Sequence, residues 1–293
     1  MLNINTNYAA SFASNAAKSS SQGLNSAMEK LSTGMRINYA KDDAAGQAIS
    51  TRLSAEVQGL QVASRNAADA QSMIDTAEGA LQETHNVLLR MRELAVQSAN
   101  GTLTDGDRAH TNAEFGQLVA EVTRIAANTT WAGKNLLDGS NSPLANALSF
   151  QIGEGANQTI DVVIADMSAT ALGGATVGQT TIPPLAHATA ANGASLGSVD
   201  DAQLAIQSID NAIDSVSTAR GSLGAVSNRL SSTMSNLDQI AVNLSASQGR
   251  IQDADFAQET GNLAKNQILQ QAATAMIAQA NASKSSVLTL VRG

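Results

Sequence analysis

The strongest constraint on the fold is a run of apolar residues, spaced alternately by three and four positions, between residues 60 and 95. Thr84 is the only polar member of this N-terminal seam, which consists of Leu60, Ala63, Ala67, Ala70, Ile74, Ala77, Leu81, Thr84, Leu88, Met91 and Ala95. Such spacing places every member on one face of a helix and is typical of a coiled coil. The pattern predicts a helix from about residue 44 to about residue 99 that packs against a partner helix.

A second seam with the same spacing occupies residues 209–251. Its 13 positions are Ile209, Ile213, Val216, Arg220, Leu223, Ser227, Leu230, Met234, Leu237, Ala241, Leu244, Gln248 and Ile251, of which ten are apolar. The two seams lie on either side of a less regular middle section. They are therefore natural partners that fold back on each other as a helical bundle.

The composition supports long helices rather than a globular enzyme core. Hydrophobic residues make up 43% of the chain but aromatic residues only 2%, so much of the apolar content is alanine. Alanine is the best helix former and buries little area per residue. The three prolines, Pro143, Pro183 and Pro184, leave residues 1–142 and 185–293 without a proline that could interrupt a helix.

Two further helices are expected in the N-terminal half. The first spans about residues 5–33 and ends at Gly34, which can take a left-handed cap. Asp42 or Asp43 can cap the following long helix. The second of these two further helices covers about residues 105–128.

The middle of the chain changes character. Apolar and polar residues alternate over 148–152 and again over 160–164, which predicts a β-hairpin. Residues 168–198 are rich in Ala, Gly and Thr, and we expect them to form an irregular surface excursion. The predicted fold class is therefore mainly α, with a long antiparallel coiled-coil or helical bundle from both chain ends and a small β-hairpin region in the middle.

The last helix, about residues 256–291, carries only a weak apolar stripe. Its members are Leu269, Ala273, Met276, Ala280, Ser283, Val287 and Leu290. A pair of terminal helices with such stripes would be marginally stable in water. We therefore expect both terminal helices to be disordered in the monomer and to become ordered when several copies pack together.

Charge and cysteine content exclude several classes of protein. The net charge of −8 disfavours nucleic-acid binding, and the absence of cysteine excludes disulfides, thiolate metal sites and cysteine nucleophiles. We expect no cleaved signal peptide at the N-terminus and no membrane span, because no run of 18 apolar residues occurs.

The remaining motifs do not indicate an enzyme or a cofactor. Residues 193–197 (GASLG) match the G-x-S-x-G pattern, but no histidine follows them in the chain. His85, His110 and His187 lack the spacing of a metal site. Two acidic triplets, 105–107 (DGD) and 253–255 (DAD), are interpreted as helix boundaries with capping carboxylates.

Several blocks toward the two ends of the chain form a distinctive set. They are residues 31–38 (LSTGMRIN), 40–46 (AKDDAAG), 92–100 (RELAVQSAN), 250–256 (RIQDADF), 267–272 (QILQQA) and 287–292 (VLTLVR). With these blocks the chain resembles bacterial flagellin, the subunit of the flagellar filament. The resemblance covers about residues 1–165 and 199–293. It implies a structural subunit that assembles into the extracellular filament for swimming and is exported unfolded, without a cleaved signal, by the flagellar type III apparatus.

The resemblance also implies a division into domains. Residues 1–42 with 254–293 would form the inner tube of the filament, and residues 43–165 with 199–253 the outer-tube domain. Residues 166–198 would form a short surface insert, much smaller than the outer domains of many flagellins. The side chains expected to pack between subunits are Leu24, Met28, Leu31, Leu269, Met276, Val287 and Leu290.

The family further implies partners other than the chain itself. They are an export chaperone on the last helix, the filament cap and hook-associated proteins, and a host Toll-like receptor. The residues that match the chaperone site are Phe256, Leu263, Ile268 and Leu269, and those that match the receptor surface are Leu88, Arg90, Arg92, Glu93, Leu94 and Glu114. Leu89 departs from the polar residue usual in well-recognised flagellins.

Three other functions compete with that of a filament subunit. A hook–filament junction protein would share the terminal helices. A flagellin-like cell-surface protein could capture a ligand through residues 168–198, and an enzyme could be grafted into the same segment. About 30 residues are too few for an independent core, which argues against the enzyme.

Overall fold

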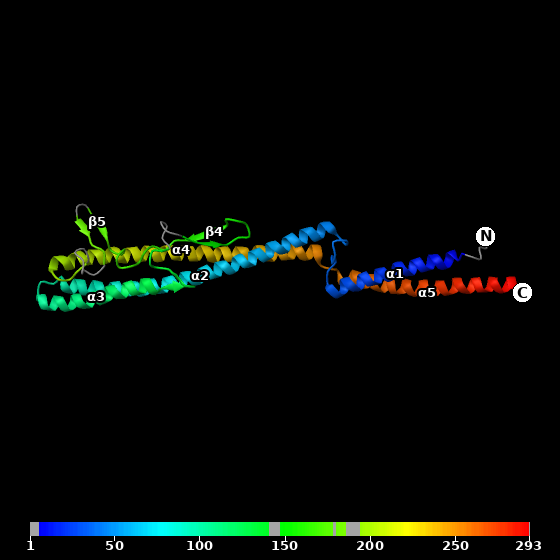
Figure 1. The fold of residues 1–293 in the computed structure, drawn as a ribbon, viewed down its shortest axis with the longest axis horizontal. Coiled ribbons are helices and arrows are strands. Elements are labelled where there is room, and N and C mark those ends of the chain that lie inside the picture. The colour runs from blue at the N-terminus through cyan, green and yellow to red at the C-terminus, as the bar shows by residue number, and fades with distance from the viewer. Residues whose placement is uncertain (1–5, 141–146, 178–179, 186–193, 293) are drawn as a thin grey trace. The chain divides into compact units, whose positions relative to one another are not determined.

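The computed structural model describes residues 6–140, 147–177, 180–185 and 194–292, with side chains described except at 175–177, 180–182 and 286–292 (Figure 1). The helices of this part are α1 (Tyr8–Thr33), α2 (Ala44–Ser98), α3 (Asp105–Asn128), α4 (Val199–Gln252) and α5 (Phe256–Arg292). Short strands occur only between α3 and α4 within these residues, so the predicted, mainly helical fold is confirmed.

The chain divides into two compact units. The terminal unit comprises Met1–Val57 and Val242–Gly293, and the central unit comprises Gln58–Ala241. The division falls inside α2 and α4 rather than at the helix ends near residues 42 and 254. The assignment of inner-tube, outer-tube and insert domains stays a prediction.

The core of the central unit lies between α2 and α4, and every position of the N-terminal seam is buried there. The C-terminal seam alternates, since Ile209, Val216, Leu223, Leu230 and Leu237 are buried whereas the members between them are half-buried. Helix α3 adds Phe115, Val119 and Val122 to the same core. The prediction that the two long seams form the chain's own bundle is confirmed.

Polar side chains link α2 to α4 beside this core. The pairs are Ser64–Asp238, Gln71–Ser227, Glu78–Arg220 and Arg92–Asp210, with distances of 3.2, 2.8, 2.8 and 2.7 Å. Residue numbers rise along α2 as they fall along α4, so the helices are antiparallel. The α2 members lie one or two heptads apart, which puts them on one side of the seam.

Among the residues described between α3 and α4, three antiparallel hairpins occur. The predicted hairpin is confirmed as β3 (Leu148–Gln151) paired with β4 (Thr159–Val162), with Phe150 opposite Ile160. A second hairpin, β1 (Thr130–Trp131) with β2 (Lys134–Asn135), was not predicted. Its turn is formed by Ala132 and Gly133, which both have positive φ angles, of 48° and 80°.

The described part of residues 168–198 departs from the expected irregular surface excursion in two respects, although turns and irregular backbone make up the rest of it. It contains a hairpin, β5 (Ala175–Val177) with β6 (Thr180–Ile182). Leu172, Leu185 and Leu196 are buried in the central core. These isolated leucines fix the segment to the bundle by burying apolar area, although the residues around them have no periodicity.

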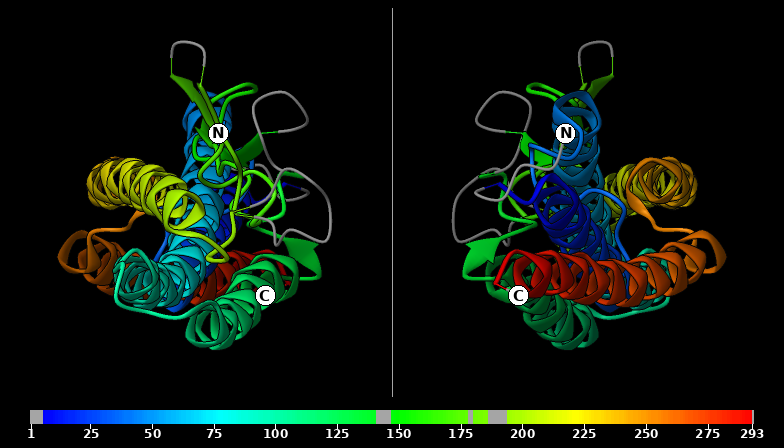
Figure 2. Two further views of the ribbon diagram at one scale, coloured as in Figure 1. Left: turned by 90° about the vertical axis from the view of Figure 1, so that its left-hand side faces the viewer. Right: turned by 90° about the vertical axis from the view of Figure 1, so that its right-hand side faces the viewer.

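In the terminal unit, α1 and α5 lie side by side and antiparallel (Figures 1 and 2). Small residues make the contact, with Ala13, Ser20 and Ala27 buried on α1 and Ala273 and Ala280 buried on α5. The helices are close together at Gly23, where an added Cβ would lie 2.7 Å from Asn266 Nδ2. This close approach is possible because glycine has no side chain.

A hydrogen bond and an ion pair fix the register of this pair near its two ends. Asn7 Nδ2 donates to the carbonyl oxygen of Ala280 at 3.2 Å, and Lys30 forms an ion pair with Glu259 at 3.5 Å. The structure thus describes α1 and α5 as paired helices. Their disorder in a free monomer stays a prediction about another state of the chain.

The helical conformation is interrupted in both chain segments of the terminal unit, after α1 and after α4, and the two breaks lie beside each other. Gly34 ends α1 in the left-handed conformation, as predicted, with φ of 72°. The Arg36 N–H donates to the carbonyl oxygen of Gln252 at 2.7 Å, and the Ala254 N–H donates to that of Gly34 at 2.9 Å. We call residues 34–43 with 249–255 the joint.

Two aspartates cap the N-termini of the helices that follow the joint. Asp43 Oδ1 accepts from the Gly46 N–H at 2.9 Å, whereas Asp42 accepts from the loop N–H groups of Asn38 and Tyr39. The residue that caps α2 is therefore Asp43. Asp255 Oδ1 accepts from the Ala257 N–H at 2.9 Å and caps α5, as predicted for the second acidic triplet.

The buried seam predicts a large difference between two leucines of α2. Leu81→Ala removes a fully buried side chain and should lower the free energy of unfolding by about 2–5 kcal/mol. Leu89→Ala, at an exposed position, should change it by less than about 0.5 kcal/mol. Urea unfolding followed by the fluorescence of Trp131, the only tryptophan, measures both. Equal losses of unfolding free energy in the two variants would contradict the burial of Leu81 in the seam.

The first turn of α3 predicts a change in the titration of Asp107. The Thr104 hydroxyl donates to Asp107 Oδ2 at 2.7 Å, and this bond, with that from the Thr104 N–H, lowers the pKa of Asp107. Thr104→Ala should raise the pKa toward its usual value, whereas Thr102→Ala should not. NMR titration of the carboxyl group measures the shift.

The sign of the pH effect follows from the direction of that shift. Because folding lowers the pKa of Asp107, the carboxylate stabilises the native chain above the unfolded-state pKa. The contribution disappears as the pH falls through the folded-state pKa. This pH-dependent part of the stability difference between wild type and Thr104→Ala should therefore shrink in acid. A difference that grew on acidification would overturn the assignment.

Candidate assembly and recognition surfaces

The pairing of α1 with α5 leaves large apolar side chains in solvent. They are Tyr8, Phe12 and Met28 on α1, and Phe256, Ile268, Leu269 and Met276 on α5. Phe12 is 79% exposed and Ile268 66% exposed. We call these seven residues the outer face of the terminal pair, and they lie on more than one side of it: at about 100° per residue, Phe12 and Met28 are about 160° apart around α1. Exposed large apolar side chains mark candidate sites of association.

The weak stripe of α5 is divided by this arrangement. Ala273 and Ala280 are buried against α1, whereas Leu269 and Met276 are exposed. Ser283 is exposed as well, and the side chains of Val287 and Leu290 lie outside the described residues. Within the chain, α1 therefore covers only the alanines among the described members of the stripe. The expected packing of this stripe between subunits stays a prediction.

The other residues expected between subunits occupy intermediate positions. Leu24 and Leu31 of α1 are half-buried, whereas Met28 is exposed. Of the expected chaperone residues, Phe256, Ile268 and Leu269 are exposed and Leu263 is half-buried. Sequence reasoning missed Tyr8 and Phe12, although aromatic residues in a chain that has so few of them are a signal.

A second surface lies on α2, where charged residues form ion pairs with both neighbouring helices. Arg90 Nη2 lies 2.8 Å from Glu114 Oε1 of α3, and Arg90 Nη1 lies 2.9 Å from Glu93. Arg92 Nε lies 2.7 Å from Asp210 of α4. Glu114, followed by Glu93, raises the pKa of Arg90, and Asp210 raises the pKa of Arg92. The side chains stay about half exposed.

The structure corrects the expected receptor surface at two positions. Leu88 and Leu94 are 0% and 2% exposed and belong to the central core. A helix turns successive residues by about 100°, so a contiguous block cannot lie on one face. The four charged members remain on the surface, beside a shallow hollow lined by Leu89, Arg92, Glu93, Val96 and Gln97.

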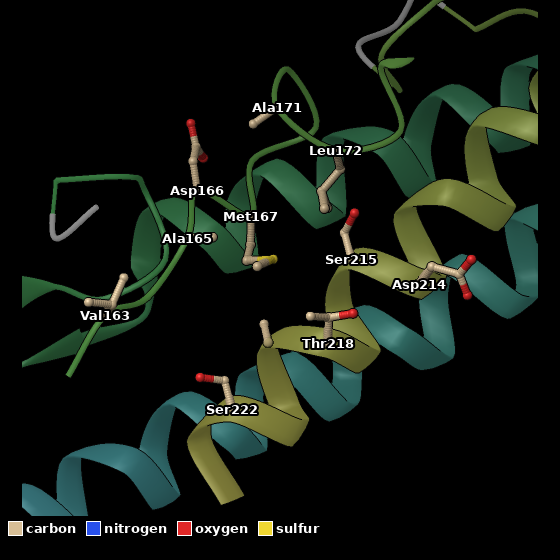
Figure 3. A pocket seen from close by; sticks show the side chains of 11 residues that line it. Val163, Ala165, Asp166, Met167, Ala171, Leu172, Asp214, Ser215, Thr218 and Ser222 are labelled. Atoms are coloured by element: carbon tan, nitrogen blue, oxygen red, sulfur yellow. The ribbon is translucent and has the colours of Figure 1, made fainter. Parts of the chain in front are cut away.

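Another hollow lies between α4 and the segment that follows β4. Figure 3 shows Met167 and Leu172 on one side of it and Ser215, Thr218 and Ser222 along α4. Asp166 Oδ1 accepts from the Ser168 N–H at 2.8 Å, and Asp214 is exposed. Two exposed or half-exposed carboxylates on an open hollow do not make a cation site.

The remaining expected motifs show no catalytic geometry. Ser195 Oγ accepts from the Gly197 N–H at 3.2 Å, and both Gly193 and His187 lie outside the described residues. In the described part of the chain, no three His, Asp or Glu side chains gather in a group that could hold a metal ion. Nor does any helix described there have the length and apolarity needed to cross a bilayer.

A helical bundle with a complete core, joined to a terminal pair whose large apolar side chains face outward, defines a class of self-assembling helical proteins. Comparison with known proteins identifies the family. The model of the bacterial flagellin N-terminal helical region matches residues 4–142, and that of the C-terminal helical region matches residues 206–291. The chain belongs to the bacterial flagellin family.

Individual relatives agree with this assignment. A flagellin of Bacillus subtilis (strain 168) is 43% identical over 309 aligned positions, which cover 99% of this chain and 100% of the relative. The flagellar filament 31.3 kDa core protein of Treponema maltophilum is 41% identical over 90% of this chain and 91% of its own length.

A solved structure shares the fold at lower identity. It is a putative flagellar hook-associated protein from Vibrio parahaemolyticus, 17% identical, with a TM-score of 0.57 over 72% of this chain and 100% of the other. At this identity, the likeness shows the fold alone.

The ion pairs on α2 predict that its charged surface contributes little to folding. Arg90→Ala and Arg92→Ala should leave the urea midpoint nearly unchanged, because exposed ion pairs stabilise proteins weakly. Leu94→Ala should lower the free energy of unfolding by about 2–5 kcal/mol, because it empties a buried position. If Leu94→Ala were as stable as Arg92→Ala, the burial of Leu94 would be contradicted.

Proposed function

We propose that this chain is the structural subunit of a bacterial flagellar filament, which it builds by polymerising with identical copies for swimming motility. The observation that carries the proposal is the outer face of the terminal pair, where Phe12, Ile268 and Met276 are exposed on helices whose buried described residues are all small. Burying these side chains against neighbouring subunits would remove a large apolar area from water.

The family supports the functional part of the proposal. The relatives named above are a flagellin and a flagellar filament core protein, and they match nearly the whole chain. A structural subunit needs neither a catalytic site nor a cofactor. The filament is extracellular, so the chain would be secreted, unfolded, through the flagellar type III apparatus.

The proposal extends to partners at two surfaces. An export chaperone would cover Phe256, Leu263, Ile268 and Leu269 of α5 before assembly, since three of these four apolar side chains are exposed on one helix and suit a chaperone groove. A host Toll-like receptor would read Arg90, Arg92, Glu93 and Glu114. The cap and hook-associated proteins would meet the ends of the polymer.

The second candidate function is that of another component of the flagellar axis. A hook–filament junction protein would present the same terminal helices, and the hook-associated structure shares the fold. The relatives at about 40% identity, however, are flagellins and filament core proteins. The filament subunit is therefore the better-supported function. No described feature of residues 168–198 favours ligand capture.

Assembly tests the proposal directly. The purified chain should form long helical filaments on sheared seeds, visible by negative-stain electron microscopy, and deletion of residues 256–293 should abolish them while Trp131 fluorescence still reports a folded central unit. Ile268→Asp should also prevent assembly, because it puts a charge on the outer face, whereas Ile268→Leu should assemble normally.

Two outcomes would count against the filament subunit. Unchanged filaments from the truncated chain or from Ile268→Asp would show that the outer face is not an assembly surface. Full motility after deletion of the gene, in cells without another flagellin gene, would separate the chain from swimming.

A further inference from the structure

The methionines of this chain fall into distinct environments. Met73, Met91 and Met167 are buried in the central core, and Met35 and Met234 are half-buried. Met28 and Met276, by contrast, are 51% and 61% exposed. Because access governs the reaction of a thioether with oxidants, these two sulfurs are the reactive ones of those described.

Both exposed methionines belong to the outer face of the terminal pair. Asn7 meets Ala280 and Lys30 meets Glu259, so residue numbers on the two helices add up to nearly the same value at each level. Met276 therefore lies level with Phe12, and Met28 lies near the Lys30–Glu259 end. Sixteen residues of helix separate these levels, roughly 24 Å. Each sulfur thus serves a different stretch of the outer face.

Among the described residues, no polar group forms a hydrogen bond with either thioether. The contrast is Met35 in the joint, whose sulfur accepts a hydrogen bond from Gln252 Nε2 at 3.0 Å. An unbranched, polarisable thioether adapts to varied apolar neighbours, which suits an intersubunit contact. The same side chain loses this property when it is oxidised, because a sulfoxide is polar and chiral.

We propose that Met28 and Met276 are an oxidation-sensitive pair through which peroxides block entry of the free chain into the filament. In the reaction with hydrogen peroxide, a sulfur lone pair attacks one oxygen, and an S–O bond forms as the O–O bond breaks. The departing hydroxide takes the proton of the hydroxyl now on sulfur, so the products are a sulfoxide and water. Burying that sulfoxide between apolar surfaces without a hydrogen-bond donor opposes assembly. Assembly in turn shields both sulfurs. This inference rests on the proposed filament function.

The test uses the full-length chain with hydrogen peroxide as the oxidant. Peptide mapping of the treated, folded monomer should find sulfoxide at Met28 and Met276 and not at Met73, Met91 or Met167. Seeded elongation of this material should fall roughly tenfold or more, since each buried sulfoxide weakens a subunit contact. Filaments treated in the same way should be oxidised more slowly at both positions.

A non-oxidisable variant provides the matched control. Met28→Leu/Met276→Leu conserves side-chain volume and should elongate equally well before and after peroxide. Methionine sulfoxide reductase provides a second control on the wild-type chain, because it should restore elongation as it removes the sulfoxides.

Three outcomes would overturn the inference: undiminished elongation of wild-type chain oxidised at both sites, equal loss in the leucine variant, or no recovery after complete reduction. If untreated wild-type chain failed to elongate, the filament function itself would fall, and the inference with it.

Discussion

The antiparallel packing of α2 against α4 is the interaction on which the central unit depends. Five of the eleven positions of the N-terminal seam are alanine, so the backbones can approach closely, but each contact buries little area. A seam of such similar residues resists a shift by one heptad only weakly. The polar pairs beside it, such as Gln71–Ser227 and Glu78–Arg220, supply the missing register, because a shift would break all of them together.

The terminal pair reverses the usual distribution of side-chain size. Ala13, Ala27 and Ala273 lie inside, and Phe12 and Ile268 lie outside. Asn7 at one end and Lys30 at the other fix the register of the two helices. Their large apolar side chains, however, are not buried within the chain. Any copy that covers the outer face stabilises the folded helices by mass action, so folding of this unit and polymerisation are linked.

The sequence predicted the helices and the central core well because heptad spacing is a local, repeated signal. The sequence did not predict burial where the contact that buries a residue lies far away in the chain. Leu172, Leu185 and Leu196 are isolated in a stretch of small residues, and only the bundle surface that they meet explains their burial. It also failed where a motif was read as a block, since Leu88 and Leu94 face the core while Arg90 and Glu93 face solvent.

The joint explains how one chain can contain both kinds of helix pair. A continuous helix would carry the phase of its apolar face from α2 back into α1, and from α4 into α5. The breaks at Gly34 and Asp253 remove that constraint, so each terminal helix can turn its small residues toward the other. Because the Arg36 and Ala254 N–H groups tie the two breaks together, α1 and α5 begin their pairing at one level. The backbone hydrogen bonds in the joint therefore set the level at which the pairing begins, and Asn7 and Lys30 hold the register along the helices, so the register does not depend on the weak apolar stripe of α5.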